Sequence, residues 1–402
     1  MRKIQMAAWP IVCALLLGSC QLPYVSDLIP STNEYDADKY LSEYEDRWQY
    51  QQLSHDEQQY YGCLYTAIQE TKNTDSYVEI DGQTQPGVRV ELPDAQLDND
   101  DITRLYEAFF TDNPQFFYLD RTYSMEGSKS LSGETYYNTL ILQYTMSTKK
   151  RIQKERELNA VVDEIMSRCP QSDEYETERY LHDQVVSRCT YDTFAAEHNS
   201  DDDPNAYTAY GALMDGKAVC EGYAKSLQLL LQKAAIPVTL ATGTSKESGE
   251  SHMWNIVTIH GENYHLDPTW NDNSDQLQYT FFNLTTDMVR QSCEIDNIDT
   301  LPDCTATAYN PFVLNDTIVD TYERQEIARK IAKRIHAGDT TIQLRFTDGK
   351  LDNGLLFLKN QNLLTSMVNN QLKAIGSHLS MWDYELWSDR SQNVLTLIQT
   401  DE

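Results

Sequence analysis

The sequence has few positive charges for its length. Its 402 residues include 32 lysines and arginines against 62 acidic residues, which gives a formal net charge of −30. No lysine- or arginine-rich run and no basic helix interrupts this excess, and binding to phosphate needs concentrated positive charge. The composition therefore argues against a nucleic-acid partner. The acidity is better explained as solubility in an exposed setting than as a specific cation site.

A complete disulfide framework is also missing, as are internal repeats and low-complexity tracts. Apart from Cys13 and Cys20 near the N-terminus and a candidate nucleophile, Cys220, the number of cysteines is odd. Cys293 and Cys304 could form a bridge in an oxidising compartment, and buried free thiols are the equal alternative. The remaining cysteines are Cys63, Cys169, Cys189, Cys293 and Cys304.

The N-terminal apolar run is too short to span a membrane as a stable helix. Two cations precede it and small residues follow it, which is typical of an export signal. The letters "LGSC" before and at Cys20 resemble the lipobox of bacterial lipoproteins. This resemblance implies removal of residues 1–19 and a lipid on Cys20 that anchors the protein to the bacterial cell membrane, facing outside the cytoplasm. An ordinary cleaved secretory signal is the alternative, and it too predicts export.

The rest of the chain reads as an α+β protein in several regions. Residues 20–38 are polar with prolines, as expected of a tether. The predicted regions are an N-terminal α+β region at 39–150, a central domain at 151–310 and a small C-terminal α/β domain at 311–402. Helices are predicted near 54–72, from Asp98, at 149–167, 172–192, 322–336 and 354–375, strands near 76–82, 87–93, 136–146, 341–346, 381–388 and 393–400, and an exposed loop at 195–205.

Cys220 precedes an apolar helix within "GKAVCEGYAKSLQLLLQKAAIPV". Leu227, Leu230 and Leu231 have the spacing of a buried helical face, so the helix is predicted to begin near Cys220. A thiol at a helix N-terminus meets the positive end of the helix dipole, which stabilises a thiolate, and the nearby N–H groups can hold an oxyanion. Gly222 lets other backbone approach. A small buried cysteine in a core helix is the alternative.

A histidine and an aspartate follow in "SHMWNIVTIHGENYHLDPTW", which reads as a hairpin. If His260 and Gly261 form its turn, His252 and Asp267 lie diagonally on one face, about 7 Å apart, where a carboxylate can orient an imidazole. The spacing thus predicts Cys220 as nucleophile on a helix, with His252 as general acid/base and Asp267 as orienter on an adjacent sheet.

The blocks "AYGALMDGKAVCEGYA", "HMWNIV" and "YHLDPTW" resemble the three motif blocks of the transglutaminase-like superfamily, in order. The resemblance covers about residues 170–290. It implies a papain-like cysteine fold, in which the cysteine helix packs on an antiparallel sheet bearing the histidine and the aspartate, and a catalytic triad of Cys220, His252 and Asp267. No cofactor and no metal are expected.

The aromatic residues Tyr207, Tyr223 and Trp254 are expected either to pack in the core or to line a substrate groove. The expected substrate is a protein or peptide, with cell-wall peptides among the candidates. Through a thioester at Cys220, acyl transfer to water would make the protein a peptidase or amidase, and transfer to an amine would make it a protein-cross-linking transglutaminase. Hydrolysis is favoured because the sequence lacks the architecture of animal transglutaminases. A non-catalytic surface binding protein is the alternative of another class.

Overall fold

The computed structural model describes residues 35–91, 96–129, 133–198, 204–273 and 276–400. The described chain divides into two compact units. The first contains the residues up to Leu240 together with Met253–Asn255, and the second contains Ala241–His252 and the residues from Ile256 onward. Both combine helices with mainly antiparallel sheets, which confirms the predicted α+β class. The predicted region boundaries at 150 and 310 stay predictions.

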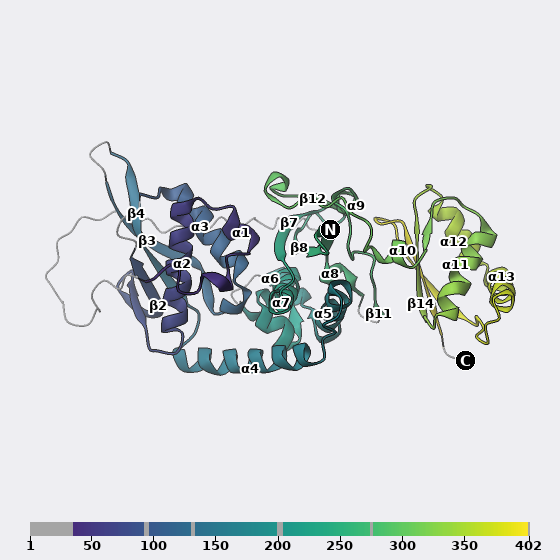
Figure 1. The fold of residues 1–402 in the computed structure, drawn as a ribbon, viewed down its shortest axis with the longest axis horizontal. Coiled ribbons are helices and arrows are strands. Elements are labelled where there is room, and N and C mark those ends of the chain that lie inside the picture. The colour runs from purple at the N-terminus through teal and green to yellow at the C-terminus, as the bar shows by residue number, and fades with distance from the viewer. Residues whose placement is uncertain (1–34, 92–95, 130–132, 199–203, 274–275, 401–402) are drawn as a thin grey trace. The chain divides into compact units, whose positions relative to one another are not determined.

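The N-terminal part of the first unit is an antiparallel four-stranded sheet, in the order β1-β2-β4-β3, with helices packed against it (Figure 1). The acidic stretch from Asp98 starts a helix as predicted, because Asp98 and Asp101 form a capping box that satisfies backbone N–H groups at the helix start. The elements are α1 (Trp48–Gln51), α2 (His55–Thr71), β1 (Tyr77–Ile80), β2 (Gln83–Glu91), α3 (Asn99–Asp112), β3 (Leu119–Lys129) and β4 (Thr135–Tyr144).

Aromatic rings fill the core of this N-terminal part. Tyr61 and Phe109 are fully buried, and their ring centroids lie 4.9 Å apart in an edge-on arrangement. Phe116 and Tyr118 are buried beside them. The aromatic segment at 109–118 is therefore a core segment rather than an exposed binding surface.

Helix α4 (Thr148–Ser167) is tied to this core by a buried cation. Arg151 has no exposed surface, donates from Nε to the carbonyl of Lys72 at 2.9 Å, and places its guanidinium 4.1 Å from the ring centroid of Tyr144. Helices α5 (Glu174–Arg188) and α7 (Cys220–Lys233) then pack on each other. Leu181 and Val185 are buried on α5, within the helix predicted at 172–192.

The predicted exposed loop at 195–205 is wrong in its first part. Helix α6 (Thr193–His198) occupies residues 195–198, because Ala195 is buried against Ala206 and Val219. Burial of a small apolar side chain here outweighs the polar composition of the segment. The short parallel strands β5 (Thr190–Tyr191) and β6 (Lys217–Ala218) lie on either side of α6 in the sequence.

The N-terminal region is joined to α7 by hydrogen bonds. The Gln228 side chain donates to the carbonyl of Thr111, and the Gln232 side chain donates to that of Asp112, both at 3.0 Å. These carbonyls belong to the last turn of α3, where they have no partner within the helix. Side chains of α7 thus complete the C-terminal end of α3.

The second unit begins with a sheet in the order β12-β7-β8-β9. The predicted two-residue turn between β8 and β9 is confirmed, since His260 (φ 50°) and Gly261 (φ 82°) both have the left-handed conformation of a tight hairpin. The elements are β7 (Val238–Ser245), β8 (Ser251–Ile259), β9 (Glu262–Leu266), α8 (Pro268–Asn271), β10 (Asp272–Asn273), β11 (Gln276–Leu277), α9 (Thr286–Ser292), β12 (Cys293–Ile295) and α10 (Pro311–Leu314).

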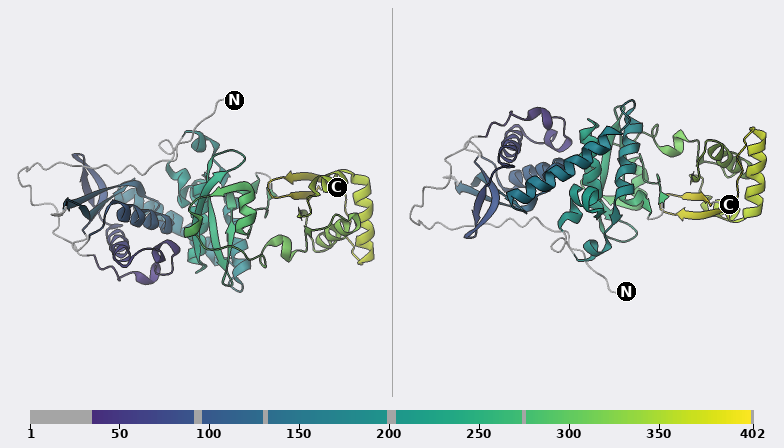
Figure 2. Two further views of the ribbon diagram at one scale, coloured as in Figure 1. Left: turned by 90° about the horizontal axis from the view of Figure 1, so that it is seen from above. Right: turned by 90° about the horizontal axis from the view of Figure 1, so that it is seen from below.

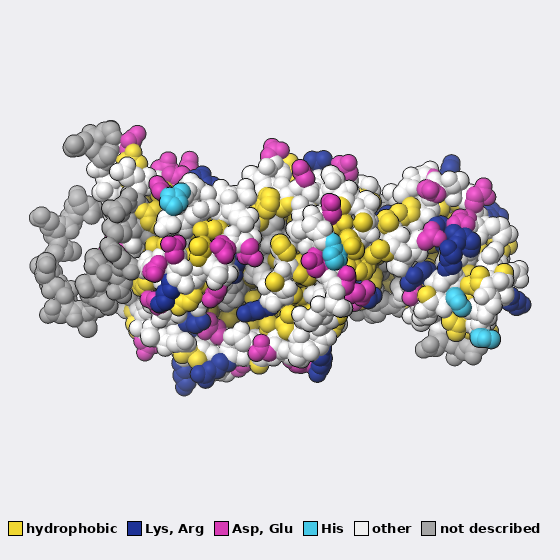
Figure 3. Space-filling view, in the orientation of Figure 1, with side chains coloured by type: hydrophobic (Ala, Val, Ile, Leu, Met, Phe, Trp, Pro, Cys, Tyr) yellow, Lys and Arg dark blue, Asp and Glu magenta, His cyan; other side chains and the backbone are white. Residues whose placement is uncertain are grey.

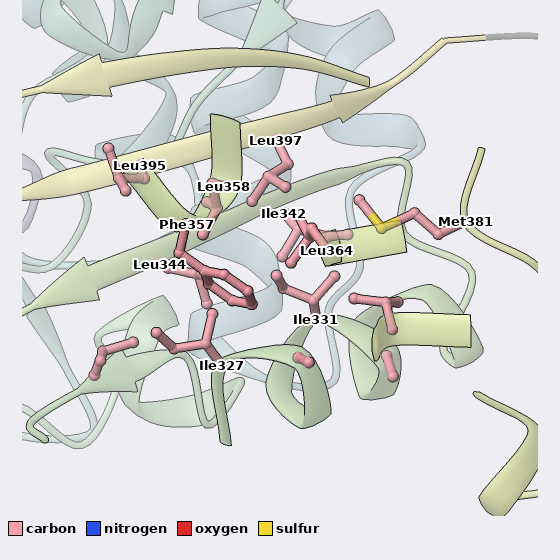
Figure 4. Close-up of a cluster of buried hydrophobic side chains, with 14 of the residues drawn as sticks. Ile327, Ile331, Ile342, Leu344, Phe357, Leu358, Leu364, Met381, Leu395 and Leu397 are labelled. Atoms are coloured by element: carbon pink, nitrogen blue, oxygen red, sulfur yellow. The ribbon is translucent and has the colours of Figure 1, made fainter. Parts of the chain in front are cut away.

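The C-terminal part of this unit has a mixed sheet in the order β13-β14-β16-β15, whose β13 and β14 are parallel. Its buried side chains come from the sheet and the three helices, as Figure 4 shows for Ile331, Leu344 and Phe357. The strands and helices can be followed from two sides in Figure 2. The elements are β13 (Ile318–Val319), α11 (Arg324–His336), β14 (Thr341–Phe346), α12 (Leu351–Lys359), α13 (Gln361–Ala374), β15 (Tyr384–Asp389) and β16 (Val394–Gln399).

The single helix predicted at 354–375 is wrong, because it is broken at Asn360. That residue has a non-helical ψ of 78°, and its side chain accepts the N–H of Leu363 as the cap of α13. Asparagine competes with the helical backbone in this way. On the C-terminal part of the face drawn in Figure 3, basic and acidic side chains lie next to each other. Among the ion pairs of this part, Asp316 contacts Lys330 and Lys333, and hydrogen bonds with these lysines lower the pKa of its carboxyl to about 2.

The burial of Asp112, at the end of α3, predicts that the stability of the folded protein depends on pH. Asp112 is fully buried and accepts the N–H of Tyr50, and burial raises the pKa of its carboxyl to about 7 despite the charge of Arg47. From pH about 4 to about 7 the folded state holds a proton that the unfolded state has lost, so this group makes stability fall as pH rises, by about 1.4 kcal/mol per unit of pKa shift.

We expect Asp112→Asn, which keeps an acceptor for Tyr50, to remove this contribution. Urea unfolding at about pH 5 and about pH 8 measures it, with the exposed Asp100→Asn as the control. Equal slopes for wild type and Asp112→Asn would contradict the assignment.

Candidate active site

Cys220 is the first residue of α7 and is half-buried. Val219 before it is extended, and Gly216 has a φ of 70°, a left-handed conformation that glycine adopts without strain. This turn and the short strand β6 place Cys220 at the N-terminal end of the helix, as predicted. Further along the same helix, the side chains of Leu227, Leu230 and Leu231 have no exposed surface, so the apolar face of α7 is buried.

The start of α7 is packed tightly at Gly222. A Cβ atom at this position would lie 2.5 Å from the carbonyl oxygen of Ala206 and 2.6 Å from the Cβ of Ala218. The same carbonyl of Ala206 accepts the N–H of Val219 at 3.0 Å. Glycine is therefore required two residues after Cys220 so that this backbone can approach the helix.

Glu221, which follows Cys220, is buried and forms an ion cluster with two cations. Its carboxylate accepts from Lys225 at 2.9 Å through one oxygen and from Arg121 through the other. Burial alone would raise the pKa of the Glu221 carboxyl, but Lys225 and Arg121 together hold it below its usual range. Burial lowers the pKa of Lys225 even beside this carboxylate. Arg121 comes from β3 of the N-terminal region.

Strand β8 contacts α7 through Asn255. This residue has no exposed surface, and its amide donates to the carbonyl of Ala224 at 2.9 Å. Both residues belong to the first compact unit. His252 is three residues earlier on the same strand and, like Asp267, belongs to the second unit.

The structure brings His252 and Asp267 together, as the hairpin register predicts. Nε2 of His252 lies 2.6 Å from Oδ2 of Asp267, and both residues are buried. The other oxygen, Oδ1, accepts the N–H groups of Thr269 and Trp270, each at 3.0 Å. The indole of Trp270 stacks on the imidazole, with ring centroids 4.2 Å apart and planes 8° from parallel. The imidazole is thus held by a hydrogen bond and by an aromatic face.

The aromatic residues predicted as a substrate groove have different positions. Tyr223 and Trp254 are 0% and 2% exposed, so they belong to the core, and a groove-lining role for them is wrong. Tyr207 is half-buried, donates its hydroxyl to the carbonyl of Ala195 at 2.9 Å, and has the guanidinium of Arg121 over its ring. Only for Tyr207 does the prediction of a groove wall stay open.

Burial disfavours the thiolate form of several other cysteines. Burial raises the pKa of Cys63 to about 11 and those of Cys293 and Cys304 to about 12, and it also raises the pKa of Cys169. Cys293 and Cys304 are free and buried, so the alternative of free thiols holds for them. These environments disfavour thiolates, which are the reactive form.

Trp270, Glu221 and Arg121 were missed as site residues from the sequence. Trp270 stands in the block "YHLDPTW" and Glu221 in "VCEGYA", so their positions next to the predicted triad were a usable signal. Arg121 had no such signal, because it is 100 residues before its partner.

Cys20 and the predicted signal at 1–19 lie outside the described residues. Within the described residues, no helix has the length and hydrophobicity needed to cross a membrane.

The packing at Gly222 predicts that Gly222→Ala is destabilising. The carbonyl of Ala206 cannot rotate away, so the start of α7 has to shift, at a cost of about 1–3 kcal/mol, which outweighs the gain of up to about 1 kcal/mol in helix propensity. We expect a lower melting temperature and slower alkylation of Cys220. The exposed Lys233→Ala is the control, and a Gly222→Ala protein as stable as wild type would contradict the close approach.

Comparisons with known proteins found a matching family model and similar solved structures. Residues 160–268 match the model of the transglutaminase-like superfamily. A solved structure described as a TGase is 16% identical over 46% of this chain and 51% of its own, with a TM-score of 0.26. A candidate cysteine protease from Cytophaga hutchinsonii is 14% identical over 38% of this chain and 63% of its own, with a TM-score of 0.24. No curated protein matches.

The chain thus spans between half and two thirds of the length of these solved structures. The family match includes Cys220, His252 and Asp267. Residues 160–268 are thus similar to the transglutaminase-like superfamily.

Proposed function

We propose that the protein is a cysteine enzyme in which Cys220, His252 and Asp267 form a catalytic triad that attacks amide or peptide carbonyls. The observation that carries this proposal is the buried hydrogen bond between His252 and Asp267. A general acid/base needs an orienting group, and a carboxylate held by backbone N–H groups is a rigid one. The half-buried thiol at the start of α7 supports Cys220 as the nucleophile.

The proposed reaction proceeds through a thioester. Asp267 engages Nε2 of His252, so Nδ1 is the nitrogen that takes the proton from the thiol. The thiolate sulfur then bonds to the carbonyl carbon, and the displaced electron pair on oxygen is stabilised by N–H groups in the first turn of α7, which have no partner within the helix. His252 returns the proton to the leaving amine. Water, deprotonated by His252, then bonds to the thioester carbon, the C–S bond breaks, a carboxylic acid leaves, and His252 returns the proton to the sulfur of Cys220.

We propose hydrolysis as the main outcome, which makes the protein a peptidase or amidase acting on a protein or peptide. An amine that replaces water in the second step would instead form a new amide, the transglutaminase reaction. The choice depends on how far the site excludes water and seats an amine.

An assay with casein and a fluorescent primary amine tests the triad and separates the two outcomes. We expect peptide fragments from the wild type and none from Cys220→Ala. Asp267→Asn keeps an acceptor for the N–H groups of α8 but loses the charge that orients His252, so we expect a loss of activity of about 10²- to 10⁴-fold with little loss of stability.

Incorporation of the amine in place of fragments would establish transfer rather than hydrolysis. Activity that survives in Cys220→Ala would contradict the proposed nucleophile. The absence of both products, together with a Cys220 that reacts with iodoacetamide no faster than Cys63, would favour a surface protein that binds without catalysis.

We also propose that the protein is exported and anchored to the cell membrane through a lipid on Cys20, on the basis of the "LGSC" sequence. Bacterial cells that express the protein should incorporate labelled palmitate into it. We expect Cys20→Ser to abolish the label and Cys63→Ser to keep it. Labelling that persists in Cys20→Ser would contradict this anchor.

A further inference from the structure

The residue that follows the proposed nucleophile, Glu221, is bound by two cations. Its single carboxylate is shared by Lys225 and Arg121, one on each oxygen. Lys225 and Glu221 are buried, whereas 48% of the Arg121 side chain is exposed. The positive charge of Arg121 is therefore accessible to solvent.

Arg121 has hydrogen-bonding capacity to spare. A guanidinium has five N–H donors, and within the part of the chain that the structure describes, Arg121 donates to a carboxylate only through Nη2 to Glu221. The neighbouring Asp120 acts on Arg121 through its charge, whereas its Oδ1 accepts the backbone N–H and the hydroxyl of Thr122. The remaining donors match the two oxygens of a carboxylate that arrives from solvent.

Two aromatic rings hold the guanidinium in place. Its Cζ lies 5.4 Å from the ring centroid of Tyr207 and 5.9 Å from that of Phe110. Burial raises the pKa of the Tyr207 hydroxyl. The charge of Arg121 lowers it, and Glu221 and Cys220 raise it further. Tyr207 is thus within electrostatic range of both Arg121 and Cys220. A cation fixed by rings and a carboxylate has little side-chain entropy left to lose on binding a ligand.

We propose that Arg121 is a specificity-determining residue that binds a carboxylate of the substrate, so that the enzyme prefers acyl groups beside an acidic group, such as acidic peptides. This inference rests on the proposed function of Cys220. The negative charge of the whole chain repels an anion at long range, but salt screens that repulsion beyond about 8 Å, whereas a contact with Arg121 is closer. Arg121 belongs to the N-terminal region, which thereby contributes to substrate choice.

Two small alkylating reagents test this proposal without a known substrate. Iodoacetate and iodoacetamide react in the same way: the sulfur of Cys220 bonds to the CH₂ carbon, the C–I bond breaks and iodide leaves. They differ in that iodoacetate carries a carboxylate. The ratio of their rates at Cys220, measured by mass spectrometry on the full chain, therefore reports on carboxylate binding, and any change in thiolate content cancels in the ratio.

We expect the ratio of the iodoacetate rate to the iodoacetamide rate to fall about fivefold or more in Arg121→Gln. Arg121→Lys should give an intermediate ratio, because lysine keeps the positive charge but lacks the planar guanidinium that donates two parallel hydrogen bonds to a carboxylate. Arg89→Gln is the matched control, because Arg89 also pairs with a glutamate, Glu126, on the N-terminal sheet. We expect this control to keep the wild-type ratio.

An unchanged ratio in Arg121→Gln, at a normal iodoacetamide rate, would overturn the role of Arg121 while leaving the nucleophile intact. A ratio that falls equally in Arg89→Gln would overturn it as well, since the effect would then be one of total charge. Wild-type Cys220 that reacts no faster than Cys63 would overturn the proposed function, and this inference with it.

Discussion

The carboxylate of Asp267 performs two tasks that depend on each other. Strand β9 ends at Leu266, and Pro268 fixes the backbone for the first position of a helix, so the chain turns at Asp267. One oxygen caps that helix and the other holds His252. Trp270 is placed over the imidazole because it is the third residue of the capped turn. The turn, the tautomer of the histidine and its stacking partner thus follow from one side chain.

The surroundings of Cys220 are determined by close backbone packing and by charge. The carbonyl of Ala206 lies against Gly222 and receives the N–H of Val219, which fixes where α7 begins. A buried Glu221 next to a thiolate would disfavour it by repulsion between like charges. Lys225 and Arg121 offset that repulsion. The carboxylate next to the proposed nucleophile is therefore neutralised by one cation of its own helix and by one from a distant part of the chain.

Local patterns predicted much of this protein because they have local causes. The start of α7 and the turn at His260 and Gly261 follow from apolar spacing and from residues that accept a left-handed backbone. The diagonal placement of His252 and Asp267 then follows from the hairpin register. The errors arose where other forces decide. A single asparagine cap divided the helix at Asn360, a tertiary contact made a helix around Ala195, and full burial removed Tyr223 and Trp254 from the predicted groove.

The ties between α3, α4 and α7 mean that a family boundary and a physical boundary need not coincide. The family match begins at residue 160, within α4, whereas Arg151 of the same helix is buried among rings of the preceding region. Glutamines of α7 complete the end of α3. A segment excised at the family boundary would lack Arg151 and would leave the amides of Gln228 and Gln232 without the carbonyls that they bind. The N-terminal region and α7 thus belong to one compact unit, so the part of the chain that presents Cys220 depends for its packing on residues outside the family match.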